Sequence, residues 1–150
     1  MFAMKVSDIM TARVVAMPAD STITAIAARM RDEHVGSVIV TEGAEMVGIV
    51  TDRQITHTVV ADGADPNSVL VSDVMFTDFV PLEPDMDLLQ AVRLQCELAM
   101  RRLPVVKDGV PVGIVSTSDI AAFTKELIDC VLVEGEVRVL RRGGRRKGSE

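Results

Sequence analysis

Two short segments of the chain carry a hydroxyl residue followed, three positions later, by a carboxyl or amide residue. VGIVTDRQ (47–54) contains Thr51 and Gln54, and VGIVSTSD (112–119) contains Ser116 and Asp119. Each pair follows an apolar run, so each hydroxyl is expected where a strand ends and a helix begins. Free N–H groups at a helix N-terminus attract phosphate, but the same spacing is also that of a capping box. Both interpretations can hold, because a capped helix end lies where an anionic ligand would dock.

These two motifs belong to an internal repeat that covers most of the chain. Val112 lies 65 positions after Val47, and at the same offset VSDIM (6–10) aligns with VSDVM (71–75). From Val6 to Thr56, 12 of the 51 aligned pairs are identical. Two matching blocks in one constant register indicate a duplicated structural unit.

Each repeat predicts the same order of elements, β-α-β-β-α. An extended run, 14–17 or 79–82, precedes a helix whose apolar residues recur at helical spacing. Asp20 or Ser21 is expected to cap the first of these helices, and Pro84 to mark the entry to its counterpart. Two β-branched runs joined by a Gly-containing turn then predict a hairpin, which a second helix follows.

The repeat also sets the fold class, α/β (α+β), and the domain boundaries. A unit of about 60 residues buries too little surface to be secure alone, so the two units are expected to pack sheet to sheet about a pseudo-twofold axis. The first unit is assigned to 6–64 and the second to 71–130. The β-branched segment 131–140 predicts an extra strand or short hairpin, and 141–150 is expected to be a basic, disordered tail.

Charge is distributed unevenly along the chain. The last ten residues hold five basic residues and one acid, whereas the other 140 hold 11 basic and 21 acidic residues. The acidic body is therefore not expected to bind nucleic acid. The tail could contact phosphate backbones, although Gly-rich basic tails are more commonly solvated and disordered.

The composition excludes several other classes of protein. The apolar runs are far shorter than the roughly 18 residues of a membrane span, and the N-terminus has no signal-peptide pattern, so a cytoplasmic protein is expected. Cys96 and Cys130 lie far apart and are expected to be free, buried thiols. Together with His34 and His57 they form no metal-ligand pattern, and no nucleophile with a matching base emerges, so neither a metal site nor a catalytic residue is expected.

The chain resembles a tandem pair of CBS domains, which are named for cystathionine β-synthase; the pair is also called a Bateman module. The resemblance is carried by V-S-D-I/V-M, by RRLPVV (101–106) and by G-I-V-[ST], and it extends from about Val6 to Phe123. It implies a non-enzymatic regulatory module that binds an adenosine-containing nucleotide (AMP, ADP, ATP, S-adenosylmethionine or NAD) in clefts between the halves. It also implies a flat homodimer that acts on a separate, unidentified partner protein, with no cofactor required.

The resemblance also implies which residues bind the nucleotide. The ligand motif of the family, Gly-apolar-any-Ser/Thr-any-any-Asp, matches Gly113 to Asp119, where the carboxylate would accept hydrogen bonds from ribose hydroxyls. The base would lie against the first strand and against the strand near Leu103, and basic residues before that strand would meet phosphate or simply form a solvated helix end. The expected binding residues are Ser116, Ser118, Asp119, Val80, Pro81, Arg101, Arg102 and Pro104.

The first half departs from this motif, because Gln54 replaces the aspartate. A hydrogen bond to a charged group contributes roughly 1.5–3 kcal/mol, so its loss could weaken ribose binding roughly tenfold to a hundredfold. A second, weaker site is therefore expected at Thr51, Arg53 and Gln54, where Arg53 could meet phosphate. The alternative is a ligand-free CBS scaffold for interaction or dimerisation, associated with nucleic acid, if at all, only through its tail.

Overall fold

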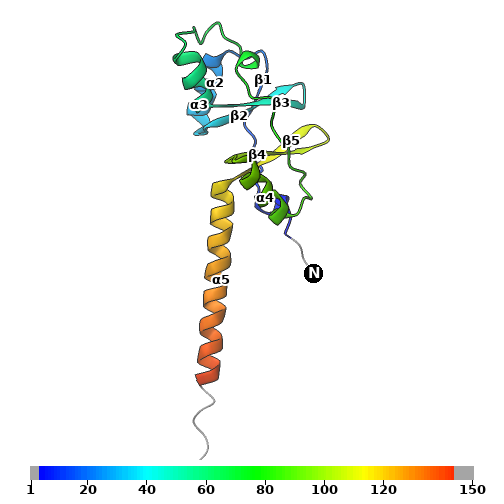
Figure 1. Cartoon of the computed structure of the whole chain (residues 1–150), viewed down its shortest axis with the longest axis vertical. Coiled ribbons are helices and arrows are strands. Elements are labelled where there is room, and N and C mark those ends of the chain that lie inside the picture. The colour runs from blue at the N-terminus through cyan, green and yellow to red at the C-terminus, as the bar shows by residue number, and fades with distance from the viewer. Residues whose placement is uncertain (1–3, 144–150) are drawn as a thin grey trace, which may run out of the picture.

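The computed structural model describes residues 4–143, which form two small sheets with helices packed against them (Figure 1). The elements in chain order are α1 (Val6–Ile9), β1 (Ala16–Pro18), α2 (Ile23–Glu33), β2 (Ser37–Glu42), β3 (Glu45–Thr51), α3 (Asp52–Gln54), the π-helix η1 (Ile55–Val60), the 3₁₀-helix η2 (Val71–Asp73), α4 (Leu88–Leu98), β4 (Arg102–Lys107), β5 (Val110–Ser116) and α5 (Thr117–Gly143). The mixed α+β class and the repeat of helix and hairpin are as the sequence predicts.

The two sheets differ at their first strand. In the first half, β1 pairs in parallel with β2, and β2 and β3 form an antiparallel hairpin. In the second half, β4 and β5 form the matching hairpin, but the predicted strand at 79–82 contributes only Leu82. Its N–H donates to the carbonyl of Pro104 at 2.8 Å, and its carbonyl accepts from Val106 N–H at 2.9 Å. Pro104 lacks the N–H that would donate to Val80 O, and Pro84 lacks the one that would donate to Val106 O, so the ladder is limited to this single bridge.

Each repeat exchanges its opening segment with the other repeat. The N–H of Val6 donates to Met86 at 2.9 Å, and Thr11 pairs with Ile114 of β5. In the reverse direction, Val71 N–H donates to Ser21 at 2.8 Å. The N-terminal helix α1 therefore completes the second half, and η2 completes the first.

The exchanged segments place a methionine on a glycine in both halves. A Cβ built on Gly113 would lie 2.6 Å from Met10 Sδ, and one built on Gly48 would lie 2.5 Å from Met75 Sδ. Only glycine leaves room for these side chains. The two blocks that recur in both repeats, VSD-(I/V)-M and VGIV, thus contact each other across the halves.

The interior consists of one apolar cluster in each half and a third between the sheets. The third cluster has Ile39, Met46, Ile49 and Val106 as its buried members, with Val14, Phe79 and Ile114 packed against them. It draws residues from both repeats, so neither half has a complete core of its own. The halves share a core about a pseudo-twofold axis, as the small size of each unit requires.

The caps of the first helices differ from the prediction. Thr22, rather than Asp20 or Ser21, is the N-cap of α2, and its hydroxyl accepts from Ala25 N–H at 3.2 Å. Asp87 caps α4 in the same way, with Gln90 N–H as donor at 3.2 Å. Several polar residues precede each helix, so the local sequence alone does not select which of them caps it.

The predicted extra strand or hairpin at 131–140 is wrong, because α5 runs without a break from Thr117 to Gly143. Extending an existing helix adds one hydrogen bond for each residue fixed, whereas an isolated two-stranded hairpin is marginal in water. The β-branched residues of this segment therefore continue the helix that begins at Thr117. The expected tail at 141–150 is helical at 141–143, and its remainder lies outside the described residues.

The two cysteines match the prediction only in part. Cys96 and Cys130 are free thiols but are exposed rather than buried, because each lies on the outer side of α4 or α5. In the part of the chain that the structure describes, no group of three His, Cys, Asp or Glu side chains could hold a metal ion. None of the described helices combines the length and the apolar character that a membrane crossing demands.

Candidate functional site

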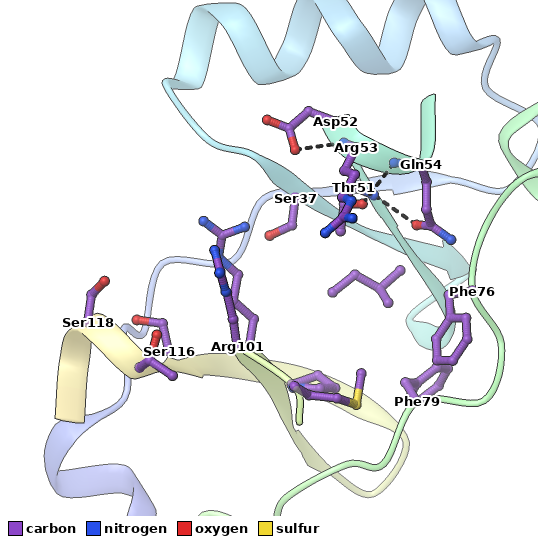
Figure 2. Close-up of a pocket in the computed structure, with 15 residues that line it drawn as sticks. Ser37, Thr51, Asp52, Arg53, Gln54, Phe76, Phe79, Arg101, Ser116 and Ser118 are labelled. Atoms are coloured by element: carbon purple, nitrogen blue, oxygen red, sulfur yellow. Dashed lines mark hydrogen bonds between the residues drawn. The ribbon is translucent and has the colours of Figure 1, made fainter. Parts of the chain in front are cut away.

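A cavity of about 680 Å³ lies between the two halves, in the size range of small-molecule sites. Figure 2 shows that its walls come from both repeats, from the ends of β3 and β5 and from the chain that enters β4. The lining residues are Ser37, Ile49, Thr51, Asp52, Arg53, Gln54, Phe76, Phe79, Met100, Arg101, Arg102, Pro104, Ser116, Thr117 and Ser118.

In the second half, the expected ligand motif forms a capping box. Asp119 N–H donates to Ser116 Oγ at 3.1 Å, while Asp119 Oδ2 accepts from the N–H and the hydroxyl of Ser116 at 2.8 and 2.9 Å. The other oxygen, Oδ1, accepts from the Thr11 hydroxyl at 3.2 Å. Ser116 and Ser118 line the cavity, but Asp119 lies behind them in the first turn of α5.

The first half repeats this arrangement. Gln54 N–H donates to Thr51 Oγ1 at 3.2 Å, and Thr51 N–H donates to Gln54 Oε1 at 3.1 Å. Gln54 Nε2 points toward Val74 O at 3.5 Å. The capping interpretation is therefore confirmed in both halves, and the glutamine that replaces aspartate preserves the local structure.

Three arginines make one part of the cavity positive. Arg102 is the first residue of β4 and Arg101 directly precedes it, and Arg53 lies in α3, just after β3, in the other half. With Asp52, they give the lining three positive charges and one negative, a balance of +2 in a chain whose net charge is −6. Among the described side chains none of the three forms a salt bridge, so their charges are available to an anion.

Gly36 allows one of these arginines to approach the first half. A Cβ built on Gly36 would lie 3.4 Å from Arg102 Nη1 and 3.2 Å from Asp52 Oδ2. Gly36 and Ser37 occupy the repeat positions of Arg101 and Arg102. Because Gly36 has no side chain, the guanidinium of Arg102 from the second half can lie against the first half.

The other part of the cavity is apolar. Phe76 and Phe79 lie next to each other at the end of the pocket away from Ser116 and Ser118 (Figure 2). Ile49, Met100 and Pro104 complete this apolar wall. Sequence reasoning missed both phenylalanines, although the chain has only four and these two lie within four positions of the end of the second VSDxM block.

The structure does not bring all the expected residues together. Val80 is half-buried and Pro81 exposed, and neither lines the cavity. The corner at Thr51 and the corner at Ser116 open into one cavity rather than into two separate clefts. The inequality of the two corners stays a prediction.

The buried side chain of Gln95 supports the strand-to-helix junction at Ser116. Gln95 is only 5% exposed, and its Nε2 donates to Val115 O at 3.2 Å and to Arg101 O at 3.4 Å. The same Arg101 carbonyl accepts from Thr117 N–H at 2.9 Å. Gln95 therefore ties β4, β5 and the first turn of α5 together beneath the arginines, whereas its repeat counterpart, Met30, has no amide.

Comparison with known families agrees with this architecture. Residues 6–61 and 71–126 each match the family model of the CBS domain. These segments correspond to the two halves that share the cavity. The chain belongs to the CBS-domain family and contains two CBS domains in tandem.

Relatives and solved structures show the same module. The chain is 38% identical over 109 residues to an uncharacterized protein of Methanopyrus kandleri, covering 71% of this chain and 56% of that one. It is 37% identical over 116 residues to the CBS domain-containing protein YhcV of Bacillus subtilis, covering 77% of this chain and 82% of YhcV. A hexameric CBS-CP12 protein from bloom-forming cyanobacteria superposes with a TM-score of 0.71 at 28% identity, covering 95% of this chain and 84% of that one.

Proposed function

We propose that this protein is a non-enzymatic regulatory module that binds an adenosine-containing nucleotide in the cavity between its CBS domains and thereby alters the activity of a separate partner protein. CBS-domain pairs are typically regulatory or ligand-binding. The observation that carries the proposal is the division of one cavity into a positive part and an apolar part.

The two parts of the cavity suit the two parts of a nucleotide. Phosphates would meet Arg53, Arg101 and Arg102, because guanidinium groups form strong, charge-assisted hydrogen bonds with phosphate oxygens. A purine base would lie against the apolar wall, where Phe76 and Phe79 offer aromatic faces for stacking. The ribose would link the two, and its hydroxyls would extend toward Ser116 at the end of the cavity opposite the phenylalanines (Figure 2).

Asp119 would bind the ligand by accepting a hydrogen bond from a ribose hydroxyl in place of the Thr11 hydroxyl. Its Oδ1 accepts from the hydroxyl of Thr11, a residue of the exchanged N-terminal segment. A ribose hydroxyl that replaces Thr11 would gain a charge-assisted hydrogen bond. Ligand binding would then release Thr11 from Asp119. Because Thr11 belongs to the segment that connects the two halves, this release could change how the halves pack against each other.

Asp119→Ala and Gln54→Ala form a matched pair of variants. Each removes a side-chain acceptor of a capping box, so each is expected to lower the unfolding free energy of the ligand-free protein by about 1 kcal/mol. Only Asp119→Ala should abolish the rise in melting temperature caused by ADP, while Gln54→Ala should reduce it little. Thermal-shift curves with and without ADP check this, and equal loss of the ADP effect in both variants would remove the special role of Asp119.

Regulation follows only if the nucleotide prefers one arrangement of the halves. The cavity takes its lining from both repeats, so a bound ligand would contact each and favour the arrangement that fits it best. The proposed setting is a cytoplasmic homodimer whose nucleotide state is detected by the regulated partner. CBS-domain proteins form oligomers, as the hexameric CBS-CP12 protein shows.

A ligand-free interaction scaffold is the second candidate. The capping boxes favour it, because they account for Ser116 and Asp119 without a ligand. The chain has no Trp and no Tyr, so a co-purified adenine nucleotide would dominate the ultraviolet spectrum near 260 nm. A purified protein without this band, and without a thermal shift in any adenosine ligand, would support the scaffold instead.

A further inference from the structure

The buried face of α4 carries a polar side chain at a position where the first half has an apolar one. The buried positions of the two helices correspond across the repeat, as Ile23 with Leu88, Ile26 with Ala91 and Met30 with Gln95. Only the last pair changes from an apolar to a polar side chain. Burying an amide costs free energy unless its polar atoms are hydrogen-bonded, so this change requires a reason other than core packing.

The amide of Gln95 is not fully hydrogen-bonded in this position. Its Nε2 faces two carbonyl oxygens, those of Val115 at 3.2 Å and Arg101 at 3.4 Å. Its Oε1 has no hydrogen-bond partner among the described residues. Both neighbours are acceptors, so a half-turn of the amide would only place oxygen against oxygen. The side chain is therefore expected to lower stability relative to an apolar residue of similar size.

The carbonyl of Arg101 is the contact that distinguishes the two halves. It accepts from Thr117 N–H at 2.9 Å, and the equivalent carbonyl of Gly36 accepts from Asp52 N–H at 3.0 Å. The first half makes this backbone junction without an amide, since Met30 occupies the equivalent position. Gly36 has no side chain to direct, whereas Arg101 lines the cavity.

The β-sheet fixes the backbone of Arg102 but not that of Arg101. Arg102 is the first residue of β4 and pairs with Ser116 of β5. Arg101 precedes the strand, in the irregular turn that follows α4. Its backbone is instead restrained through its carbonyl, which accepts hydrogen bonds from Thr117 and Gln95.

We propose that Gln95 is a positioning residue for the ligand, which holds Arg101 in the orientation that meets the phosphate of the bound nucleotide. A group that is already oriented loses less conformational freedom on binding, and this preorganisation raises affinity. This role rests on the proposed function. It accounts for the occurrence of the buried amide in the half whose equivalent carbonyl belongs to an arginine of the cavity.

Gln95→Met introduces the residue that the first half carries at the equivalent position. The variant should fold with a melting temperature equal to or above that of the wild-type protein, while its dissociation constant for ADP rises roughly fivefold. Its dissociation constant for adenosine, which has no phosphate, should not change. Met30→Leu, a conservative change in the first half, is the control and should leave both affinities unchanged. Isothermal titration and thermal unfolding measure these quantities.

A double-mutant cycle shows through which arginine the amide acts. In an Arg101→Ala background, Gln95→Met should have no further effect on ADP affinity, whereas in an Arg102→Ala background it should still cause the same loss. A lower melting temperature with equal loss of ADP and adenosine binding would make Gln95 a structural residue and overturn the proposal. An unchanged ADP affinity in Gln95→Met would overturn it as well. A wild-type protein that binds no ADP would instead overturn the proposed function, and this role with it.

Discussion

Alanine in place of both Arg101 and Arg102 should weaken ADP binding by roughly a hundredfold or more, while adenosine binding changes little. Each guanidinium that contacts a phosphate contributes roughly 1.5–3 kcal/mol, and every 1.4 kcal/mol corresponds to about a tenfold change in affinity. Adenosine has no phosphate, so it should depend on the apolar wall instead. Isothermal titration of both ligands separates the two contributions.

Arg93→Ala is the matched control for this experiment. Arg93 is an exposed arginine on α4 that does not line the cavity, so its removal should leave both affinities unchanged. If the double variant lost adenosine and ADP equally, the arginines would be acting through the fold rather than through phosphate. If Arg93→Ala weakened ADP binding as much, the effect would reflect overall charge.

Alanine at Gly48 or Gly113 should destabilise the whole chain, although neither glycine lines the cavity. The new Cβ would overlap Met75 in the first half or Met10 in the second. Overpacking of this kind costs typically 1–3 kcal/mol, or roughly 2–12 °C in melting temperature for a chain of this size. Thermal or urea unfolding of the two variants measures the loss.

Double variants distinguish the two glycines. Around Gly48 the three nearest atoms all belong to the Met75 side chain, so Met75→Ala should relieve much of the strain of Gly48→Ala. Gly113 also faces the backbone carbonyl of Thr11 at 3.0 Å, so Met10→Ala should relieve less. The mismatched pair, Gly48→Ala with Met10→Ala, should be additive; strong coupling there would contradict the exchange of segments.

The internal repeat made the architecture predictable. An apolar pattern that recurs at one offset identifies paired units, and small paired units must share a core. The sequence could not show that VSDIM packs on the other repeat, because a repeat reveals which residues are equivalent and not which of them touch. The Met10–Gly113 contact joins segments that are about 100 positions apart in the chain, and no local pattern records it.

The candidate site was predictable only in part. The hydroxyls of Thr51 and Ser116 follow from the strand-to-helix junctions, and the arginines from their place before β4. Phe76 and Phe79 were missed because they lie in an irregular segment whose position depends on the exchange of η2. Asp119 was expected in the pocket, but its capping bonds hold it behind Ser116, since a side chain in the first turn of a helix often bonds to the backbone that precedes it.

The end of the chain shows the limits of local propensity. The β-branched residues of 131–140 favour a strand, yet helix α5 had already begun at Thr117 and extends through them. β-propensity depends on a neighbouring strand with which to pack, and the end of α5 lies away from both sheets (Figure 1). In this helix Val131 and Leu132 remain largely exposed.

Calorimetric titration of the wild-type protein with ADP tests the central claim most directly. The account predicts saturable binding with one strong site for each chain, and any second site at least tenfold weaker. Absence of heat with ADP and with every other adenosine ligand, in a protein free of co-purified nucleotide, would contradict nucleotide binding. Two sites of equal affinity would contradict the distinction between the Asp119 and Gln54 corners.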